Sequence, residues 1–226
     1  MRIRSAEPGD LSALTAIYNH YVLHTAAVFA EQSLTEEARR PWFAQFAERG
    51  PYRLFVAEED GRLFGYASSV PFLPLSAYRE TVETTIFLAP GHTRRGLGTR
   101  LYRALFEALA GERLHRAYAA IVPPNRASVA LHLRFGFVRA GFFSEYALKW
   151  GHYHSSLLME KRIGRRHLAR TGAGPGVPAD ARHSPESHRD RRQAREAVTT
   201  PAPYGRMGAG PQRTNPRPVS ESDRKR

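Results

Sequence analysis

A single glutamate interrupts an apolar, β-branched stretch of the chain. Residues 81–89 read TVETTIFLA, in which Glu83 stands among Thr, Val, Ile, Phe and Leu. On the two-residue period of a strand, Glu83 shares a face with Thr81, Thr85 and Phe87. Partial burial raises the pKa of a carboxyl group toward neutrality, which suits a general base. Glu83 is therefore a candidate catalytic base, although a surface-facing glutamate in an alternating strand would produce the same pattern.

A glycine-rich, basic turn follows this stretch. In PGHTRRGLG (90–98), Gly96 and Gly98 allow the backbone to approach an anion closely, and Arg94 and Arg95 add positive charge. The unpaired N–H groups at the start of a helix also attract anions. The turn therefore predicts a pyrophosphate site, although glycines at helix starts often serve packing alone.

Two other nucleotide-binding patterns fit this turn less well. A dinucleotide-binding fold calls for a third glycine, where this chain has Leu101. A P-loop calls for Lys followed by Ser or Thr after the last glycine, where this chain has Thr99 and Arg100.

The residue types that are absent also limit the chemistry. The chain has no cysteine, so disulfides, thiolate metal sites and an acyl-cysteine intermediate are excluded. His115, His152, His154 and His167 form no pair with carboxylates at metal-ligand spacing. We expect no metal site, and any acyl transfer would be direct.

The hydrophobic periodicity predicts the elements that position these residues. A short strand at 2–4 precedes a helix capped by Asp10, and a second helix begins near Thr35 and breaks or restarts at Pro41. A hairpin turns at Asp60 and Gly61 between strands 53–59 and 62–70. The later elements are a strand at 81–89, a helix from Gly98, a strand at 115–122, a short helix at 129–135 after the turn PPNRAS, and strands at 137–148 and 153–163. This order predicts an α/β fold with a single mixed, mostly antiparallel sheet and helices on both faces.

The chain changes character after Ile163. Residues 164–226 contain no Phe, Trp or Ile, and their 14 Arg and Lys against six Asp and Glu carry about +8 of the net charge of +13. Such a segment cannot bury enough apolar surface to fold by itself. We expect one domain at 1–163 and a basic disordered tail at 164–226, which would contact nucleic acid if it has a partner at all.

No stretch is apolar enough to suggest a signal peptide or a membrane-spanning segment. The N-terminal residues MRIRSAEPGD are charged, and a membrane-spanning helix needs about 18–20 apolar residues. We therefore expect no membrane partner and a cytoplasmic location.

Several motifs of the chain stand in a characteristic order between residues 2 and 163. They are IYNHYV (17–22), AY (77–78), TVETTIFLAP (81–90), RRGLGTRLY (94–102), PNRASVALHLRFGF (124–137) and LKWGHYH (148–154). Together they resemble the Gcn5-related (GNAT) superfamily of N-acetyltransferases, and within it the phosphinothricin and methionine sulfoximine acetyltransferases.

The resemblance implies acetyl-CoA as the co-substrate and assigns residues to it. The backbone of Ile86, Phe87 and Leu88 would pair with the pantetheine arm as another strand would. Residues Arg94, Arg95, Gly96, Leu97, Gly98 and Thr99 would hold the pyrophosphate, and Asn125 would reach the pantetheine or its phosphate. Turn chemistry alone would also favour an asparagine at position 125.

The resemblance also implies the catalytic residues. Glu83 matches the family's catalytic glutamate, and His132 matches a histidine near the active site. His132 would shuttle a proton or orient the substrate, or it would simply be a hydrogen-bonded structural residue.

For the acceptor, the resemblance implies the primary amine of a small amino acid analogue. The surrounding residues would be Phe29, Ser76, Ala77, Tyr78, Lys149 and Tyr153. The chain departs from its relatives here, because Phe72, Leu73, Pro74 and Leu75 stand where the family has basic residues, and Ser155 and Ser156 replace the Asp-Val of its W-H-D-V motif. A homodimer and a role in antibiotic or herbicide resistance are further implications. The alternatives are an acetyltransferase of protein N-termini or polyamines and a non-catalytic nucleic-acid-binding protein.

Overall fold

The strands and helices follow one another in the order that the sequence predicts. The computed structural model describes residues 1–92 and 96–164. The elements are β1 (Arg2–Ser5), α1 (Leu11–His24), α2 (Glu36–Phe43), β2 (Leu54–Glu59), β3 (Arg62–Pro71), β4 (Thr81–Leu88), α3 (Leu97–Leu109), β5 (Arg116–Ile121), α4 (Arg126–Arg134), β6 (Val138–Lys149) and β7 (His152–Arg162), with 3₁₀ turns at Pro8–Asp10 and Ser76–Tyr78. The predicted basic tail, apart from Gly164, lies outside the described residues.

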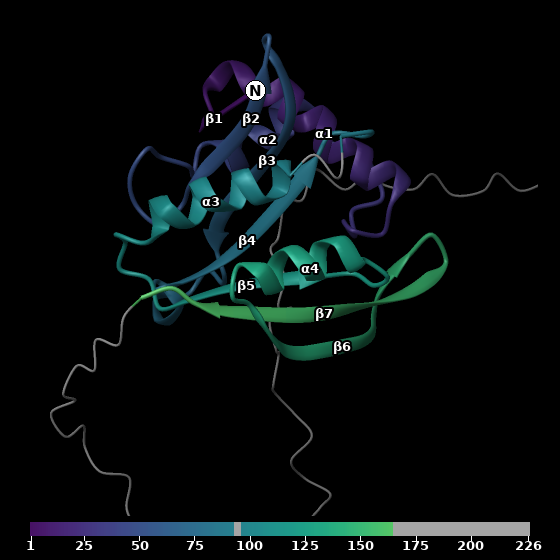
Figure 1. The fold of residues 1–226 in the computed structure, drawn as a ribbon. Helices are drawn as coiled ribbons and strands as arrows, with labels where there is room; N and C mark the ends of the chain where they lie inside the picture. Colours follow the sequence, from purple (N-terminus) through teal and green to yellow (C-terminus); the bar gives the residue numbers. More distant parts are fainter. Residues whose placement is uncertain (93–95, 165–226) are drawn as a thin grey trace, which may run out of the picture.

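The seven strands form one sheet in the order β1-β2-β3-β4-β5-β7-β6. Every neighbouring pair is antiparallel except β4 and β5, which run parallel. The predicted mixed, mostly antiparallel sheet is therefore confirmed. In Figure 1, β1 to β4 form the upper part of the sheet, and β5, β7 and β6 form the lower part.

Helices cover both faces of the sheet, as predicted. Residues of α1 and α2 pack with Leu54, Val56 and Tyr66 on one face, whereas α3 and α4 pack with Ala67, Val82 and the apolar residues of β5 on the other. On α3 the buried residues recur at helical spacing, which explains why this amphipathic segment docks on the sheet. These residues are Leu97, Leu101, Tyr102, Leu105 and Leu109.

The start of α1 differs from the prediction. The carboxylate of Asp10 does not cap the helix. It accepts hydrogen bonds at 2.6 and 2.8 Å from the two terminal nitrogens of Arg4 and one at 2.8 Å from the backbone N–H of Glu7. The charge-assisted bonds from Arg4 and the N–H of Glu7 thus hold the carboxylate, and none of its hydrogen bonds goes to the first turn of α1.

The second helix does not break at Pro41, contrary to expectation. It runs unbroken from Glu36 to Phe43. Pro41 removes the donor for the carbonyl of Glu37, but both residues are exposed, so water can satisfy that carbonyl. The helix is held by Arg39, whose buried guanidinium lies 4.0 Å from the ring centroid of Tyr18 and 3.9 Å from that of Trp42.

The fourth helix begins three residues earlier than predicted. It spans Arg126–Arg134, because the side chain of Asn125 caps it and draws the end of the expected turn into the helix. Within the described part of the chain, no helix is long and apolar enough to cross a membrane.

The close approach of β3 to β4 can be tested at Gly65. A Cβ at Gly65 would lie 2.7 Å from both the carbonyl oxygen of Phe87 and Cδ2 of Leu88. We expect Gly65→Ala to lower the free energy of unfolding by about 1–3 kcal/mol, the usual effect of overpacking, as measured by urea denaturation. Gly111→Ala is the matched control, since nothing lies within 4 Å of its added Cβ. Equal stability of the two variants would contradict this packing.

Candidate active site

The site is built where β4 and β5 part from each other. The two strands pair only through three successive positions, Thr81–Glu83 on β4 with Arg116–Tyr118 on β5. Beyond Glu83, β4 continues beside β3, whereas β5 continues beside β7. Figure 1 shows the two strands diverging toward the end of β4 that leads to α3. One edge of β4 therefore has no neighbouring strand among the described residues, and Glu83 lies at the vertex.

The Glu83 carboxylate is partly buried and has no protein partner. No group in the described ranges 1–92 and 96–164 donates a hydrogen bond to it. Burial raises its pKa from 4.5 to about 7, because the charged form loses hydration that nothing replaces. A carboxylate with a pKa near neutrality can accept a proton and release it again at physiological pH.

One wall beside Glu83 is aromatic. Tyr118 lies directly across from Glu83 in the β4–β5 register, and Phe72 stacks on Tyr118 with ring centroids 4.7 Å apart. Tyr78, in the short 3₁₀ turn with Ser76 and Ala77, contacts Phe72 at 5.8 Å. Of the three predicted acceptor residues in this turn, Tyr78 is therefore joined to the Glu83 wall, and Ser76 and Ala77 are exposed.

A second aromatic group surrounds Phe29. Its ring lies 5.6 Å from Tyr146 and 6.2 Å from His154. The Tyr146 hydroxyl is 3.0 Å from Oγ of Ser156, and the pKa of Tyr146 is raised by burial and further by the nearby charge of Glu83. The predicted acceptor residue Phe29 is thus connected to the Glu83 region through Tyr146.

Three of these aromatic residues were not predicted as site residues. The sequence marks Phe72 only as a departure from the family pattern, and it indicates no role in the site for Tyr118 or Tyr146. The strand period offered one signal, because Phe72 continues the face of β3 that carries Val70, the partner of Glu83. The contacts of Tyr118 and Tyr146 depend on strand order and could not be seen in the sequence.

Lys149 acts within the fold and offers no free charge. Its ammonium group donates to the carbonyls of Val22, Thr25 and Val28 at 2.7, 2.7 and 2.6 Å, and the residue is completely buried. A cation at the C-terminal end of α1 also complements the helix dipole. Because all three donors are used, Lys149 fixes the segment that leads to Phe29.

The other predicted acceptor residue in this region, Tyr153, points away from the site. It is 67% exposed. Neighbouring strand residues point to opposite faces, so Tyr153 lies on the side of β7 opposite His154. The structure does not bring Tyr153 together with Glu83.

The predicted pyrophosphate turn is described only in part, since Arg94 and Arg95 lie outside the described residues. Gly96 begins α3 with φ 71°, a left-handed conformation that favours glycine, and no side chain caps the helix. A Cβ on Gly98 would lie 3.1 Å from Cδ2 of Leu131 on α4, so this glycine also serves packing. The start of α3 therefore leaves backbone N–H groups for an anion.

The two other residues of this turn have partners in the protein. The side chain of Leu97 is buried in the core, which leaves only its backbone for a ligand. The Thr99 hydroxyl accepts a hydrogen bond of 3.1 Å from Arg134.

The predicted pantetheine edge of β4 is partly occupied by Tyr21. The Tyr21 hydroxyl donates to the carbonyl of Leu88 at 2.8 Å and accepts from its N–H at 3.3 Å. The Phe87 ring packs 4.8 Å from Tyr21, and Ile86 is partly buried against the core. A strand-like ligand that pairs with Leu88 would have to displace the tyrosine hydroxyl.

Asn125 and His132 both make structural hydrogen bonds. Oδ1 of Asn125 accepts from the N–H of Ser128 at 3.1 Å. His132 is buried, with Nδ1 2.8 Å from the carbonyl of Ser128 and Nε2 2.8 Å from the hydroxyl of Tyr102. Nδ1 therefore donates and Nε2 accepts. Burial lowers the pKa of His132 more than the Ser128 bond raises it, which favours the neutral ring. Both nitrogens are satisfied within the core.

Among the residues that the structure describes, no group of three or more His, Cys, Asp or Glu could hold a metal ion. The arrangement thus offers a buried base, an open strand edge and a helix N-terminus. These features suit proton abstraction beside a ligand that pairs with β4.

Comparisons with known proteins point in one direction. The sequence profile of the acetyltransferase (GNAT) family matches residues 14–137. The chain is 48% identical to a phosphinothricin N-acetyltransferase of Streptomyces coelicolor, over 68% of this chain and 91% of that protein. It is 32% identical to an L-methionine sulfoximine/L-methionine sulfone acetyltransferase of Salmonella typhimurium, over 72% of this chain and 95% of that protein.

A solved structure shows the same fold. It is a GNAT superfamily phosphinothricin acetyltransferase from Sinorhizobium meliloti in complex with acetyl-CoA, with a TM-score of 0.69 and 28% identity. The alignment covers 80% of this chain and 96% of that one.

The clamp, by which we mean the three hydrogen bonds from Lys149 to the carbonyls of Val22, Thr25 and Val28, can be tested by removing the charge of Lys149. We expect Lys149→Met to lower the free energy of unfolding by about 2–4 kcal/mol, because a buried unpaired acceptor costs about 1–3 kcal/mol and three carbonyls lose their donor. The matched control is Lys161→Met, since Lys161 donates to one carbonyl, that of Phe135, at 2.6 Å. Urea denaturation of both variants measures the difference, and equal losses would refute the clamp.

Proposed function

The chain belongs to the acetyltransferase (GNAT) family, and we propose that it transfers the acetyl group of acetyl-CoA to the primary amine of a small amino acid analogue. The relatives named for phosphinothricin and for methionine sulfoximine or sulfone support this acceptor class. The chain contains no cysteine, so transfer is direct. A cytoplasmic location and a role in resistance to such analogues are part of this proposal.

Glu83 is the general base. The observation that carries this assignment is a carboxylate with a pKa of about 7 and no protein partner at the vertex of β4 and β5. Glu83 accepts a proton from the substrate ammonium, directly or through water, and leaves a neutral amine. Acetyl-CoA supplies the thioester carbonyl carbon that this amine attacks. The C–S bond then breaks, coenzyme A leaves as the thiolate, and the proton that the new amide nitrogen loses converts the thiolate to the free thiol.

The co-substrate binds between the open edge of β4 and the start of α3. The unpaired N–H groups that follow Gly96 at the start of α3 suit the pyrophosphate of acetyl-CoA. The acetyl-CoA bound to the Sinorhizobium meliloti relative supports this co-substrate. Arg94 and Arg95 would add charge. Asn125 and His132 position α4 in this assignment, because their side chains are held within the helix and the core.

The function is tested by release of free thiol from acetyl-CoA over a panel of amines. The panel contains phosphinothricin, methionine sulfoximine, methionine sulfone, common amino acids, polyamines and short peptides. Turnover with amino acids or their analogues is the expected result. Turnover with polyamines or peptides alone would contradict the acceptor class, and no turnover with any amine would contradict the activity.

The role of Glu83 is tested with Glu83→Gln. We expect kcat to fall by about 10²- to 10⁴-fold, the usual contribution of a general base. A protonated carboxyl cannot accept a proton, so kcat/KM of the unchanged protein should rise with pH and level off above about 7, and the variant should lose this step. Glu80→Gln is the control, because Glu80 pairs with Arg113 at the surface. A pH profile that persists in Glu83→Gln would assign the step to another group.

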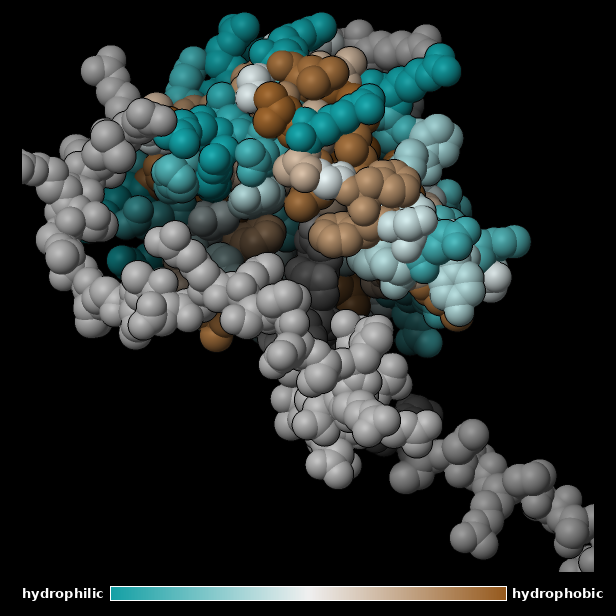
Figure 2. Space-filling view, turned by 90° about the horizontal axis from the view of Figure 1, so that it is seen from below, coloured by the Kyte–Doolittle hydropathy of each residue, from teal (hydrophilic) through white to brown (hydrophobic). Residues whose placement is uncertain are grey.

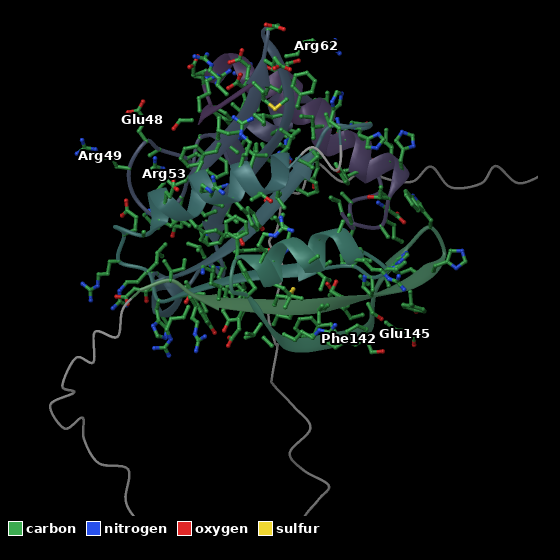
Figure 3. All side chains as sticks on the ribbon, in the orientation of Figure 1. Glu48, Arg49, Arg53, Arg62, Phe142 and Glu145 are labelled. Atoms are coloured by element: carbon green, nitrogen blue, oxygen red, sulfur yellow. The ribbon has the colours of Figure 1, made fainter. Side chains whose placement is uncertain are left out.

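We also propose a homodimer that buries the surface formed by α4 and β6. A groove of about 410 Å³ lies there, with a mostly apolar lining that includes Val129, Leu133, Phe142 and Leu157. Leu133 is 51% and Phe142 58% exposed. Figure 2, which views the side of β6 and β7, shows hydrophobic side chains among hydrophilic ones at the surface, and Figure 3 labels Phe142 on β6 at the lower edge of the molecule. A second copy covers such a patch through the same residues on both subunits.

The dimer is tested by sedimentation of Phe142→Asp. A charge at the centre of an apolar interface disfavours association, so we expect the sedimenting mass to fall to that of the monomer. Leu23→Asp is the control, since Leu23 is 48% exposed on α1 and should leave the dimer intact. A monomeric unchanged protein would rule out this assembly.

A further inference from the structure

The wall beside Glu83 is made of stacked aromatic rings. Phe72 and Tyr118 stack at 4.7 Å with an interplanar angle of 30°. Tyr118 and Val70 are the two cross-strand neighbours of Glu83. An amine whose proton goes to Glu83 would therefore have this stack within reach of its own side chain.

A cation on the same strand as Tyr118 is already neutralised. Arg116 precedes Tyr118 by two residues on the same face of β5, and its Nη1 lies 3.1 Å from Oε1 of Glu160. Glu160 in turn pairs with Tyr118 in the register of β5 and β7. An acidic ligand at this position would have to compete with the Glu160 carboxylate for Arg116.

Two buried cations on the same side of the sheet are also out of reach. Lys149 gives its three donors to backbone carbonyls. Arg39 is 1% exposed and is enclosed between the rings of Tyr18 and Trp42. Neither side chain can reach a ligand unless it leaves these contacts and the packing of α1 and α2 opens.

Among the described residues, the exposed Arg79 and Arg162 lie near the ends of β4 and β7. Arg79 donates to the carbonyl of Ser76 within its own turn at 3.1 Å. Arg162 lies at the end of β7, opposite Arg116. Water screens charges at exposed positions, so these two arginines offset little of the cost of placing an anion beside the rings and Glu83.

We propose that the acceptor is an amino acid with an uncharged, apolar side chain, and that this side chain lies on the Phe72–Tyr118 stack, with aromatic rings preferred. The inference rests on the proposed acetyl transfer at Glu83 and narrows its substrate class. An anionic side chain would lose hydration against the rings without gaining a partner, and the Glu83 carboxylate would repel it. A planar apolar side chain gains offset or edge-on contact with the stack.

The test compares kcat/KM for thiol release with L-phenylalanine, L-tryptophan and L-methionine against L-glutamate and phosphinothricin. We expect the apolar acceptors to be favoured by at least about 100-fold, because a hydrophobic pocket rejects an added hydroxyl by about that factor and an unpaired charge costs more to bury than a hydroxyl. Equal or greater kcat/KM for phosphinothricin or glutamate would overturn the inference while leaving acetyl transfer intact. No turnover with any acceptor would overturn the proposed function itself.

Variants of Phe72 distinguish the loss of a contact with the acceptor side chain from a general loss of folding. Phe72→Arg should raise kcat/KM for phosphinothricin and lower it for phenylalanine, whereas Phe72→Leu should raise KM for phenylalanine by up to about 10-fold, the upper contribution of an aromatic pair. Both should leave KM for acetyl-CoA within about twofold, which a general loss of folding would not do. Unchanged acceptor preference in Phe72→Arg would refute the placement.

The exposed arginines provide the second set of variants. Arg79→Ala and Arg162→Ala should leave the ranking of acceptors unchanged, because neither guanidinium takes part in recognition. If either variant selectively abolished turnover of an acidic acceptor that the unchanged protein uses, an arginine-bound anion would replace this proposal.

Discussion

The brief pairing of β4 with β5 is the constraint on which the site depends. Three residue pairs join the strands, and each then follows a different neighbour. Backbone groups on a strand edge need partners, so the edge of β4 beyond Glu83 must be met by protein, water or a ligand. Tyr21 meets it at Leu88. The same divergence leaves Glu83 at the end of the paired region, buried enough to raise its pKa yet beside an open edge.

Three cations of the described residues, two buried and one partly buried, are used within the fold and not for recognition. Lys149 joins the turn between β6 and β7 to the end of α1, across more than 120 residues of sequence. Arg39 holds α2 against Tyr18, and Arg116 pairs with Glu160. A charge buried for structure must keep its partners, so it is lost to ligand binding. In the proposed site, the acceptor side of the sheet would therefore select its substrate mainly through aromatic rings.

The order and faces of the elements were readable from the sequence because hydrophobic periodicity reports burial directly. The predictions of the helix cap at Asp10 and of the break at Pro41 were wrong because tertiary contacts overrode the local preference. Asp10 carries a typical capping side chain, but Arg4 pairs with it. A proline usually ends a helix, but α2 continues through Pro41 to Phe43 because Arg39 packs between Tyr18 and Trp42. Local rules predict the role of a residue from its neighbours in sequence, whereas in both cases the contact that decided the role came from the tertiary structure.

By itself, the sequence determined that Glu83 lies on a strand face and that glycines begin the following helix, because strand period and helix-start chemistry are local properties. It also suggested Lys149 as a residue that meets the acceptor. Only the tertiary structure decided that Lys149 is consumed by three carbonyls and that Phe72 and Tyr118 stand beside Glu83. The physical reason is that strand order and register set these contacts. Both arise from packing the whole sheet, which no short stretch of the chain encodes.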